Sequence, residues 1–176
     1  MKIAVLDIET TGFSPAADLI VEIGIVELCL ETGDRRVIYD KVVREDGYGD
    51  GHRNSWIFFN SDLNHDDVMC ASPVDNEELS DIFSRYRVTA YNKKFDLGFL
   101  KHRGFDFDEL PCPMIAATPV CRIRNRWGGY KWPTVTEAYR FFVGDDGYVE
   151  RHRGASDAMD EARIVWEMYK RGYFVV

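Results

Sequence analysis

The sharpest local feature of this chain is the sequence Lys-Ile-Ala-Val-Leu-Asp-Ile-Glu-Thr-Thr-Gly at residues 2–12. Residues 2–8 form a compact apolar run, which predicts a central strand. Side chains two apart on a strand point to the same face, so Asp7 and Glu9 would present both carboxylates on one side. Two like charges side by side are costly to bury unless a cation neutralises them. Hard oxygen ligands at this spacing suit Mg²⁺ or Mn²⁺, whereas the simpler alternative is a solvent-facing acidic pair at a strand end.

The rest of the chain predicts more strands and then alternating helices and strands. Residues 19–30 are rich in β-branched side chains, which favour a long strand. The turn sequence at 31–34 predicts a hairpin, whose returning strand would include residues 36–39. Residues 44–61 have the composition of a loop. A short strand is expected at 88–91, and helices are expected near residues 75–83, 96–102, 113–121, 134–143 and 156–170.

This order of elements indicates an α/β fold, in which a mixed sheet carries helices on its faces. At 176 residues the chain is long enough for one domain with a proper core and too short for two. No apolar run approaches the roughly 20 residues of a membrane span, and Asp7 comes too early for a signal peptide. We therefore expect a single cytoplasmic domain over residues 1–176 that does not enter a membrane.

The charges of the chain are unevenly distributed. The formal net charge of −8 argues against avid, non-specific binding to nucleic acid, although bound divalent cations would reverse the local field at a metal site. Residues 122–132 hold four cations and three aromatic side chains within eleven residues. Phosphate neutralisation combined with base stacking is how proteins bind single strands, so Arg124, Arg126 and Trp127 are candidate substrate contacts. The alternative for this segment is a solvated helix end with Trp132 covering the core.

Two further segments carry candidate site residues. Asp96 follows Asn92-Lys-Lys-Phe and opens an expected helix, where an acidic residue is also ordinary helix-start chemistry. His152 precedes the final helix and Asp157 begins it. Taken alone, His152 would be a solvated histidine in a charged loop.

Taken together, the three segments resemble the exonuclease motifs of the DnaQ-like family, the DEDDh branch of the ribonuclease H-like superfamily. The first motif, Asp-x-Glu with Thr-Thr-Gly, stands at 7–12, and the second, Asn-x-x-Phe-Asp, at 92–96. The third, His followed five residues later by Asp, stands at His152 and Asp157. Residues 20–24 resemble the family's second strand, and residues 130–140 are similar to a subgroup of stand-alone bacterial and phage exonucleases. The resemblance implies a ribonuclease H-like mixed sheet of five strands, three antiparallel and then parallel ones, flanked by helices.

The resemblance also implies an activity, which is metal-dependent 3′→5′ exonuclease cleavage of single-stranded nucleic acid to nucleoside 5′-monophosphates. Two Mg²⁺ or Mn²⁺ ions would be bound by Asp7, Glu9, Asp96 and Asp157, with Asp7 shared between them. Asp96 would support the second ion partly through water. His152 would take the proton from the attacking water, because histidine is the side chain that exchanges protons near neutral pH.

Substrate contacts are expected around the first two motifs. Thr10 and Thr11 would offer main-chain or hydroxyl contacts to the terminal nucleotide, and Phe13 is a candidate wedge beside its base. Asn92 of the second motif is grouped with these contacts. The sequence departs from the family at Tyr91, where a histidine is frequent, and at residues 57–68, which match the family's nucleotide-contacting segment poorly.

Several alternatives remain open at this stage. The third motif can also be aligned in another register, with Ser156 and Glu161 in place of His152 and Asp157. We reject this alignment because it loses the histidine. DNA is favoured as substrate on the subgroup resemblance alone, and an exoribonuclease or oligoribonuclease is the alternative. An endonuclease acting on RNA–DNA hybrids and a non-catalytic nucleic-acid-binding module share the fold. The oligomeric state is left open, with a homodimer among the options.

Overall fold

The three N-terminal strands form the antiparallel part of one sheet, as the sequence predicts. In the computed structural model, which describes residues 1–176, they are β1 (Lys2–Thr10), β2 (Ile20–Cys29) and β3 (Arg35–Val42). The short strand β4 (Val88–Thr89) pairs in parallel with β1, which gives the strand order β3-β2-β1-β4. The mixed α/β sheet is therefore confirmed.

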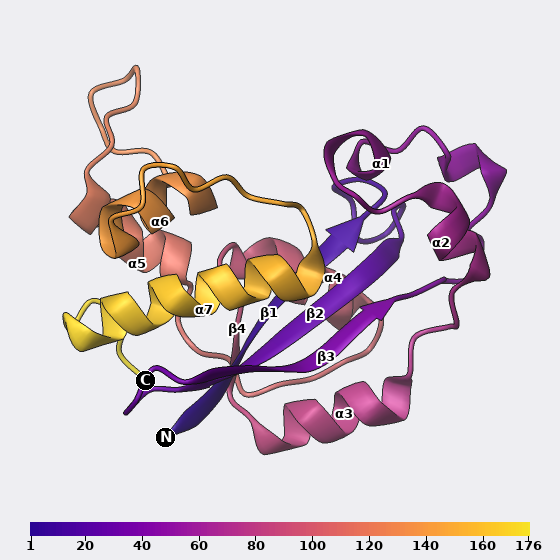
Figure 1. Cartoon of the computed structure of the whole chain (residues 1–176), viewed down its shortest axis with the longest axis horizontal. Coiled ribbons are helices and arrows are strands. Elements are labelled where there is room, and N and C mark those ends of the chain that lie inside the picture. The colour runs from indigo at the N-terminus through magenta and orange to yellow at the C-terminus, as the bar shows by residue number, and fades with distance from the viewer.

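Helices cover both faces of this sheet (Figure 1). The long helix α7 (Gly154–Lys170) crosses β2 and β1 on one face, beside α5 (Pro113–Cys121) and α6 (Val135–Val143). The helices α3 (Asn76–Arg85) and α4 (Lys93–His102) pack on the opposite face. None of the helices combines the length and the apolar character that crossing a membrane requires.

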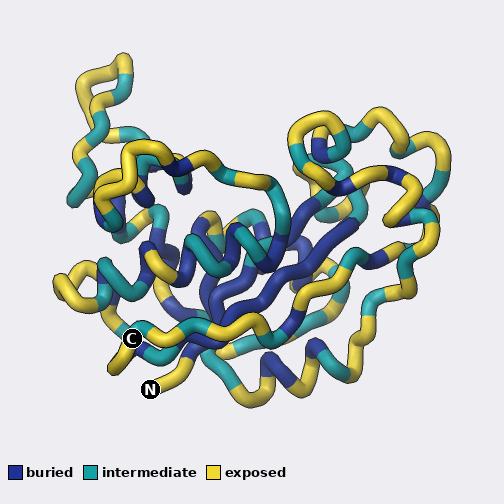
Figure 2. Tube along the Cα trace, in the orientation of Figure 1, coloured by how far each residue is buried: buried dark blue, intermediate teal, exposed yellow.

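The alternation of side chains along β1 separates two hydrophobic cores. Ile3 and Val5 belong to the core under α7, whereas Leu6 and Ile8 belong to the core under α3 and α4. Figure 2 shows the sheet and the inner side of α7 as the most deeply buried part of the chain. Because side chains two apart share a face, the residues that continue the Ile3 and Val5 series at the end of β1 must point toward the α7 side.

Residues 44–70 form a small lobe, where the sequence predicts only a loop up to residue 61. The lobe contains a 3₁₀ turn (Asp50–His52), α1 (Ile57–Asn60) and α2 (His65–Cys70). It has its own buried cluster, whose members are Val21, Tyr48, Ile57, Leu63 and Val68. Helices of four and six residues carry too little periodic signal to be recognised in a sequence rich in Gly, Asp and Asn.

The expectation of five strands is wrong by one strand. The fifth position of the sheet is occupied by residues around Glu109, which form only an isolated parallel bridge to Val88. Asp106, Asp108 and Pro111 surround this bridge, and aspartate and proline are poor strand formers. Helix boundaries also differ slightly, because α4 begins at Lys93 and α7 begins at Gly154.

The N-terminus of α7 touches the backbone of β2 where two glycines face each other. A Cβ atom at Gly24 would lie 2.0 Å from the backbone nitrogen of Ala155 and 2.0 Å from the carbonyl carbon of Gly154. A Cβ atom at Gly154 would lie 2.8 Å from the backbone nitrogen of Gly24. Both glycines are therefore required for α7 to approach the sheet this closely.

We expect Gly24→Ala to destabilise the protein by about 3 kcal/mol, because the added methyl group meets rigid backbone that cannot move aside. The measurement is urea unfolding followed by circular dichroism. The matched control is Gly98→Ala in α4, where an added Cβ meets nothing within 4 Å. This control should be neutral or stabilising by about 0.5–1 kcal/mol, since alanine favours helix. Equal stability of the two variants would contradict the close contact.

Candidate active site

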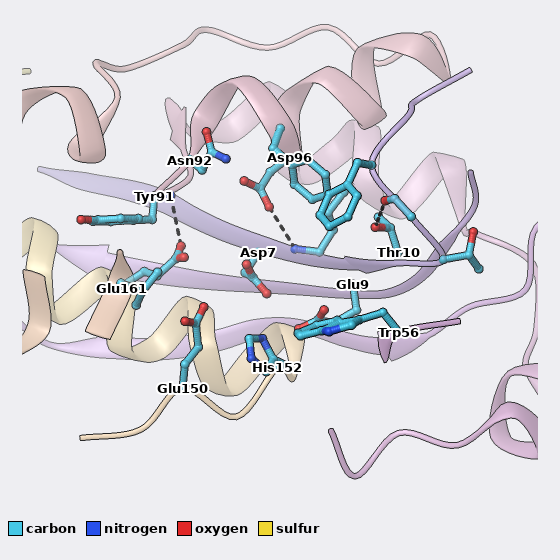
Figure 3. Close-up of a pocket in the computed structure, with 16 residues that line it drawn as sticks. Asp7, Glu9, Thr10, Trp56, Tyr91, Asn92, Asp96, Glu150, His152 and Glu161 are labelled. Carbon is cyan, nitrogen blue, oxygen red and sulfur yellow. Dashed lines mark hydrogen bonds between the residues drawn. The ribbon is translucent and has the colours of Figure 1, made fainter. Parts of the chain in front are cut away.

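The two carboxylates of β1 open into a pocket of about 320 Å³ at the end of that strand. Asp7 and Glu9 both line this pocket, as their shared face predicts. They lie on the side of the sheet that α7 covers, so Glu150 and His152 before α7 and Glu161 within it complete the pocket (Figure 3). The main contributions come from three segments that are far apart in the sequence, which are the end of β1 with the turn after it, the residues around the start of α4, and residues 150–161.

His152 and Asp157 meet Glu9 on the α7 side of this pocket. One ligand atom from each of these three residues can be chosen so that all lie within 4.8 Å of one another. The carboxylate of Asp157 accepts backbone hydrogen bonds from Arg151 at 3.2 Å and Arg153 at 3.0 Å, on either side of His152. His152 has the left-handed backbone angle φ = 54°. Asp157 therefore fixes the loop that presents His152.

Asp96 approaches from the opposite side, in the first turn of α4. Its Oδ1 accepts a hydrogen bond of 3.3 Å from the backbone nitrogen of Ile8, the residue between the two carboxylates of β1. Burial raises the pKa of Asp96 to about 7, against the favourable effect of the backbone N–H groups that donate to it. The buried position of Asp96 distinguishes it from an ordinary helix-start carboxylate, which would be solvated.

The pocket concentrates negative charge in a weakly hydrated environment. Burial raises the pKa of Asp7 well above its usual range, and the neighbouring carboxylates of Glu161 and Glu9 raise it further. Burial and the nearby Asp157 do the same for the pKa of Glu9. The Oδ2 atom of Asp7 is buried and has no hydrogen-bond partner. A bound cation would satisfy such a buried oxygen, and no protein donor competes for it.

The residues present thus fit a divalent cation. All the candidate ligands on Asp7, Glu9, Asp96 and Asp157 are carboxylate oxygens, the donors that Mg²⁺ and Mn²⁺ prefer. Burial is the main cause of their raised pKa values, and a bound cation would favour the ionised forms against it.

Two further carboxylates line the pocket, Glu150, which sequence reasoning missed, and Glu161, which it named only in the rejected alignment of the third motif. Glu161 is 3% exposed, and its Oε2 accepts a hydrogen bond of 3.1 Å from the backbone nitrogen of Tyr91. Burial, reinforced by Asp96, raises its pKa well above the usual range. Burial and the neighbouring Asp157 raise the pKa of Glu150 to about 7. Glu161 follows Asp157 by one helical turn, a spacing that places both on one face of α7 and could have revealed it.

Aromatic side chains flank the carboxylates, and one of them comes from the lobe at 44–70. The ring of Trp56 contacts that of His152 edge-to-face, with centroids 4.8 Å apart. Trp56 is 54% exposed and Phe13 is 85% exposed, and both line the pocket. Exposed aromatic rings beside a polar pocket are suited to stacking on a planar ligand group. Trp56 was not anticipated, because the sequence around it is that of a loop.

The predicted contacts Thr10, Thr11 and Asn92 also line the pocket. The Thr10 hydroxyl donates to the carbonyl oxygen of Gly12 at 2.6 Å, and the Thr11 hydroxyl accepts from the backbone nitrogen of Leu19 at 2.9 Å. These bonds shape the turn after β1, and the Thr11 hydroxyl keeps its own proton for a ligand.

The basic and aromatic segment at 122–132 lies outside the pocket. It projects from the body beyond α5 and α6 as an arm, closed by an antiparallel bridge between Arg124 and Tyr130 (Figure 1). The guanidinium group of Arg126 lies 4.7 Å from the centroid of the Trp127 ring, which is 80% exposed. The segment starts at Arg122, the C-cap residue of α5, and continues beyond the helix. Trp132 is 64% exposed, so it does not cover the core. Its C-terminal end leads through residue 133 to Val135, which lines the pocket.

Comparisons with known proteins show which solved structures share this fold. No protein-family model matches the sequence. No curated protein sequence matches it either. Among solved structures, a full-length 3′-exonuclease has a TM-score of 0.72 at 16% identity, over 99% of this chain and 62% of that one. The nuclease domain of 3′hExo, a DEDDh family member bound to rAMP, has a TM-score of 0.68 at 19% identity, over 97% of this chain and 92% of that one.

A third similar structure is cell-death related nuclease 4, with a TM-score of 0.69 at 14% identity. It is matched over 97% of this chain and 64% of its own. The chain therefore spans less than two thirds of the length of two of these three proteins. At such low identities the likeness concerns the fold, and the chain has the fold of the DEDDh 3′-exonucleases.

Proposed function

We propose that this chain is a metal-dependent 3′→5′ exonuclease that acts on single-stranded nucleic acid. One observation carries the proposal: Asp7, Glu9, Asp96, Asp157 and His152 come from three distant segments and converge on one site. They do so on the fold of the DEDDh 3′-exonucleases. A fold that serves as a binding module alone would not need to retain this costly set of buried carboxylates.

The proposed metal ligands are Asp7, Glu9, Asp96 and Asp157. Two bound Mg²⁺ or Mn²⁺ ions would supply charge stabilisation at the scissile phosphate and a nucleophile at neutral pH. His152 would accept a proton from the attacking water, and its place beside Glu9 and Asp157 supports this role. The products would be nucleoside 5′-monophosphates. Thr10, Thr11 and Asn92 would contact the terminal nucleotide, while Phe13 and Trp56 would stack beside its base.

DNA is the first substrate we propose, and RNA is the second. RNA has support from two similar structures, of which one concerns recognition of a histone mRNA stem-loop by a 3′-exonuclease and the other is bound to rAMP. Contacts to the 2′-hydroxyl distinguish the two sugars. Matched single-stranded DNA and RNA, labelled at either end, therefore test the direction of cleavage and the substrate class together.

In this assay the wild-type protein with Mg²⁺ or Mn²⁺ should shorten the strand from its 3′ end. Asp7→Ala should abolish turnover, and EDTA should do so reversibly. His152→Ala should lower kcat by about 10²–10⁴-fold, the scale expected for losing a positioned proton acceptor. Its affinity for the metal should survive, since carboxylates hold the ion.

The matched control for the histidine is His102→Ala, at the exposed end of α4, which should leave the rate unchanged. Full activity of Asp7→Ala in the presence of EDTA would refute the proposed nuclease. A near wild-type kcat for His152→Ala would return that residue to the role of a charged loop residue.

The arm at 122–132 should bind the strand away from the cleavage site. Arg124→Ala and Arg126→Ala should each weaken binding and reduce the slope of log K against log salt by about 1. Trp127→Ala should weaken binding by about 1–3 kcal/mol if a base stacks on its exposed ring. Fluorescence anisotropy with a labelled oligonucleotide in Ca²⁺ measures these effects. Arg85→Ala in α3, on the other face of the sheet, is the control. If the arm variants bind with the same affinity and salt dependence as this control, the arm is not part of the proposed interface.

The buried carboxylates should make the metal-free protein less stable as pH rises. Asp96 has an unfolded pKa near 3.8 and a folded pKa of about 7, so the folded state binds its proton more tightly. Its contribution is fully favourable below pH 4 and is lost as pH rises through 7. Thermal unfolding with EDTA across this range should show the decline, and Asp96→Asn should reduce it. Asp146→Asn removes an exposed charge and should not.

Metal should oppose this decline selectively. At pH 8 a metal concentration of about 100 Kd should raise Tm by roughly 5–10 °C, because it binds only the folded carboxylates. At pH 4.5 protonated carboxyls should bind the ion poorly, so Tm should hardly change. An equal increase at both pH values would argue that the ion binds elsewhere.

A further inference from the structure

Glu22 of β2 is a buried carboxylate beside the site that does not line the pocket. It is paired in register with Glu9 of β1, so the two side chains share the α7 face of the sheet. Only 1% of Glu22 is exposed. A second carboxylate directly across from a proposed metal ligand would be strongly unfavourable without a partner of its own.

That partner is the segment immediately after His152. The Nε atom of Arg153 lies 3.0 and 3.1 Å from the two carboxylate oxygens of Glu22, and its Nη2 atom lies 2.7 Å from Oε1. The backbone nitrogen of Gly154 donates to Oε2 at 3.0 Å. Three donors therefore hold one carboxylate in a fork geometry, which fixes position as well as neutralising charge. Glu22 is thus engaged by protein groups and is not free to ligate a cation.

The geometry of His152 requires such an anchor. A positive φ is unfavourable for a side chain with a Cβ atom, and it persists only where the surroundings hold it. Asp157 holds the loop from within, through the backbone nitrogens of Arg151 and Arg153. Glu22 holds the next residues from the sheet, and Gly24 lets the chain reach it. The loop at 151–154 is thereby fixed both to the helix and to the sheet.

We propose that Glu22 is a positioning residue for His152, acting through Arg153 and Gly154 to hold the imidazole beside Glu9 and Asp157. The proposal concerns the same site as the proposed exonuclease, and its consequence for turnover rests on that function. The placement of His152 by Glu22 does not rest on it. The competing role for Glu22 is a simple anchor of α7, whose removal would lower stability without moving the imidazole.

Nuclear magnetic resonance of the histidine rings tests the placement without any assay of activity. The chain has four histidines, so ring-labelled protein gives few resonances, and His152→Ala assigns that of His152. Glu22→Gln should shift or broaden the His152 signal and leave those of His52, His65 and His102 in place. An unchanged His152 signal in folded Glu22→Gln protein would overturn the proposal.

The matched control is Glu27→Gln, on the opposite face of the same strand. Glu27 is 7% exposed and is bound by Lys2 at 2.9 Å and Arg36 at 3.3 Å, so it is also a buried carboxylate held by cations. Its replacement should lower Tm without moving the His152 signal. Arg153→Lys is the second variant, for use if the Glu22→Gln protein does not fold. It keeps the positive charge but loses the forked contacts of the guanidinium group with Glu22, so it should also shift the His152 signal. A His152 signal that stays in place in folded Arg153→Lys protein would also overturn the proposal.

A double-mutant cycle tests the consequence for turnover. Glu22→Gln should lower kcat by about 10–100-fold, the scale for losing a group that orients an active-site side chain, and leave KM within about 3-fold. In the His152→Ala background the same change should lower kcat by less than about 2-fold, because the imidazole it positions is gone. If Glu22→Gln lowered kcat by the same factor in the His152→Ala background as in the wild type, the proposal would be overturned. A wild-type protein without nuclease activity would instead refute the proposed function, and the ring signals would still decide the role of Glu22.

Discussion

The approach of α7 to the backbone of β2 is the contact on which the rest of the site depends. Gly24 and Gly154 remove the two Cβ atoms that would separate helix from sheet. The helix then begins beside Glu9, so that Asp157 and Glu161, one turn apart, both face the carboxylates of β1. A helix displaced outward by the width of a methyl group would leave Asp157 too far away to join them. Backbone proximity, more than any single side chain, therefore assembles the centre.

The same proximity brings several buried carboxylates close together, and the protein supplies hydrogen-bond donors or cations to only some of them. Asp96 and Asp157 each accept backbone N–H donors, which favour their ionised forms. Glu22 is neutralised by Arg153. Asp7 has no such donor for its buried Oδ2. The protein alone thus leaves this carboxylate oxygen without a donor, in the pocket where the three segments meet.

Much of this arrangement could be predicted from the sequence, for reasons that differ between residues. Strand periodicity places Asp7 and Glu9 on one face, and the antiparallel strands up to Val42 are equally clear from their β-branched runs. Asp96 and His152 could be proposed only from motif resemblance, because each alone is ordinary helix-start or loop chemistry. Glu161 entered only as an alternative to Asp157, although helical spacing lets α7 present both. Trp56 and Glu150 lie in segments without periodicity, where only tertiary contacts decide which side chains turn inward. The fifth strand was overestimated, because Asp and Pro near Glu109 reduce it to a single bridge.

The lobe at 44–70 has a hydrophobic cluster distinct from the two that bury the sheet. Elements with separate small cores open at lower free energy than the rest of a protein, so the lobe can unfold locally while α7 and the carboxylates remain in place. It carries Trp56, the aromatic ring nearest to His152. The pocket wall that holds Trp56 can therefore accumulate substitutions independently of the wall that holds the carboxylates. Selection for new ligands could act on one without dismantling the other.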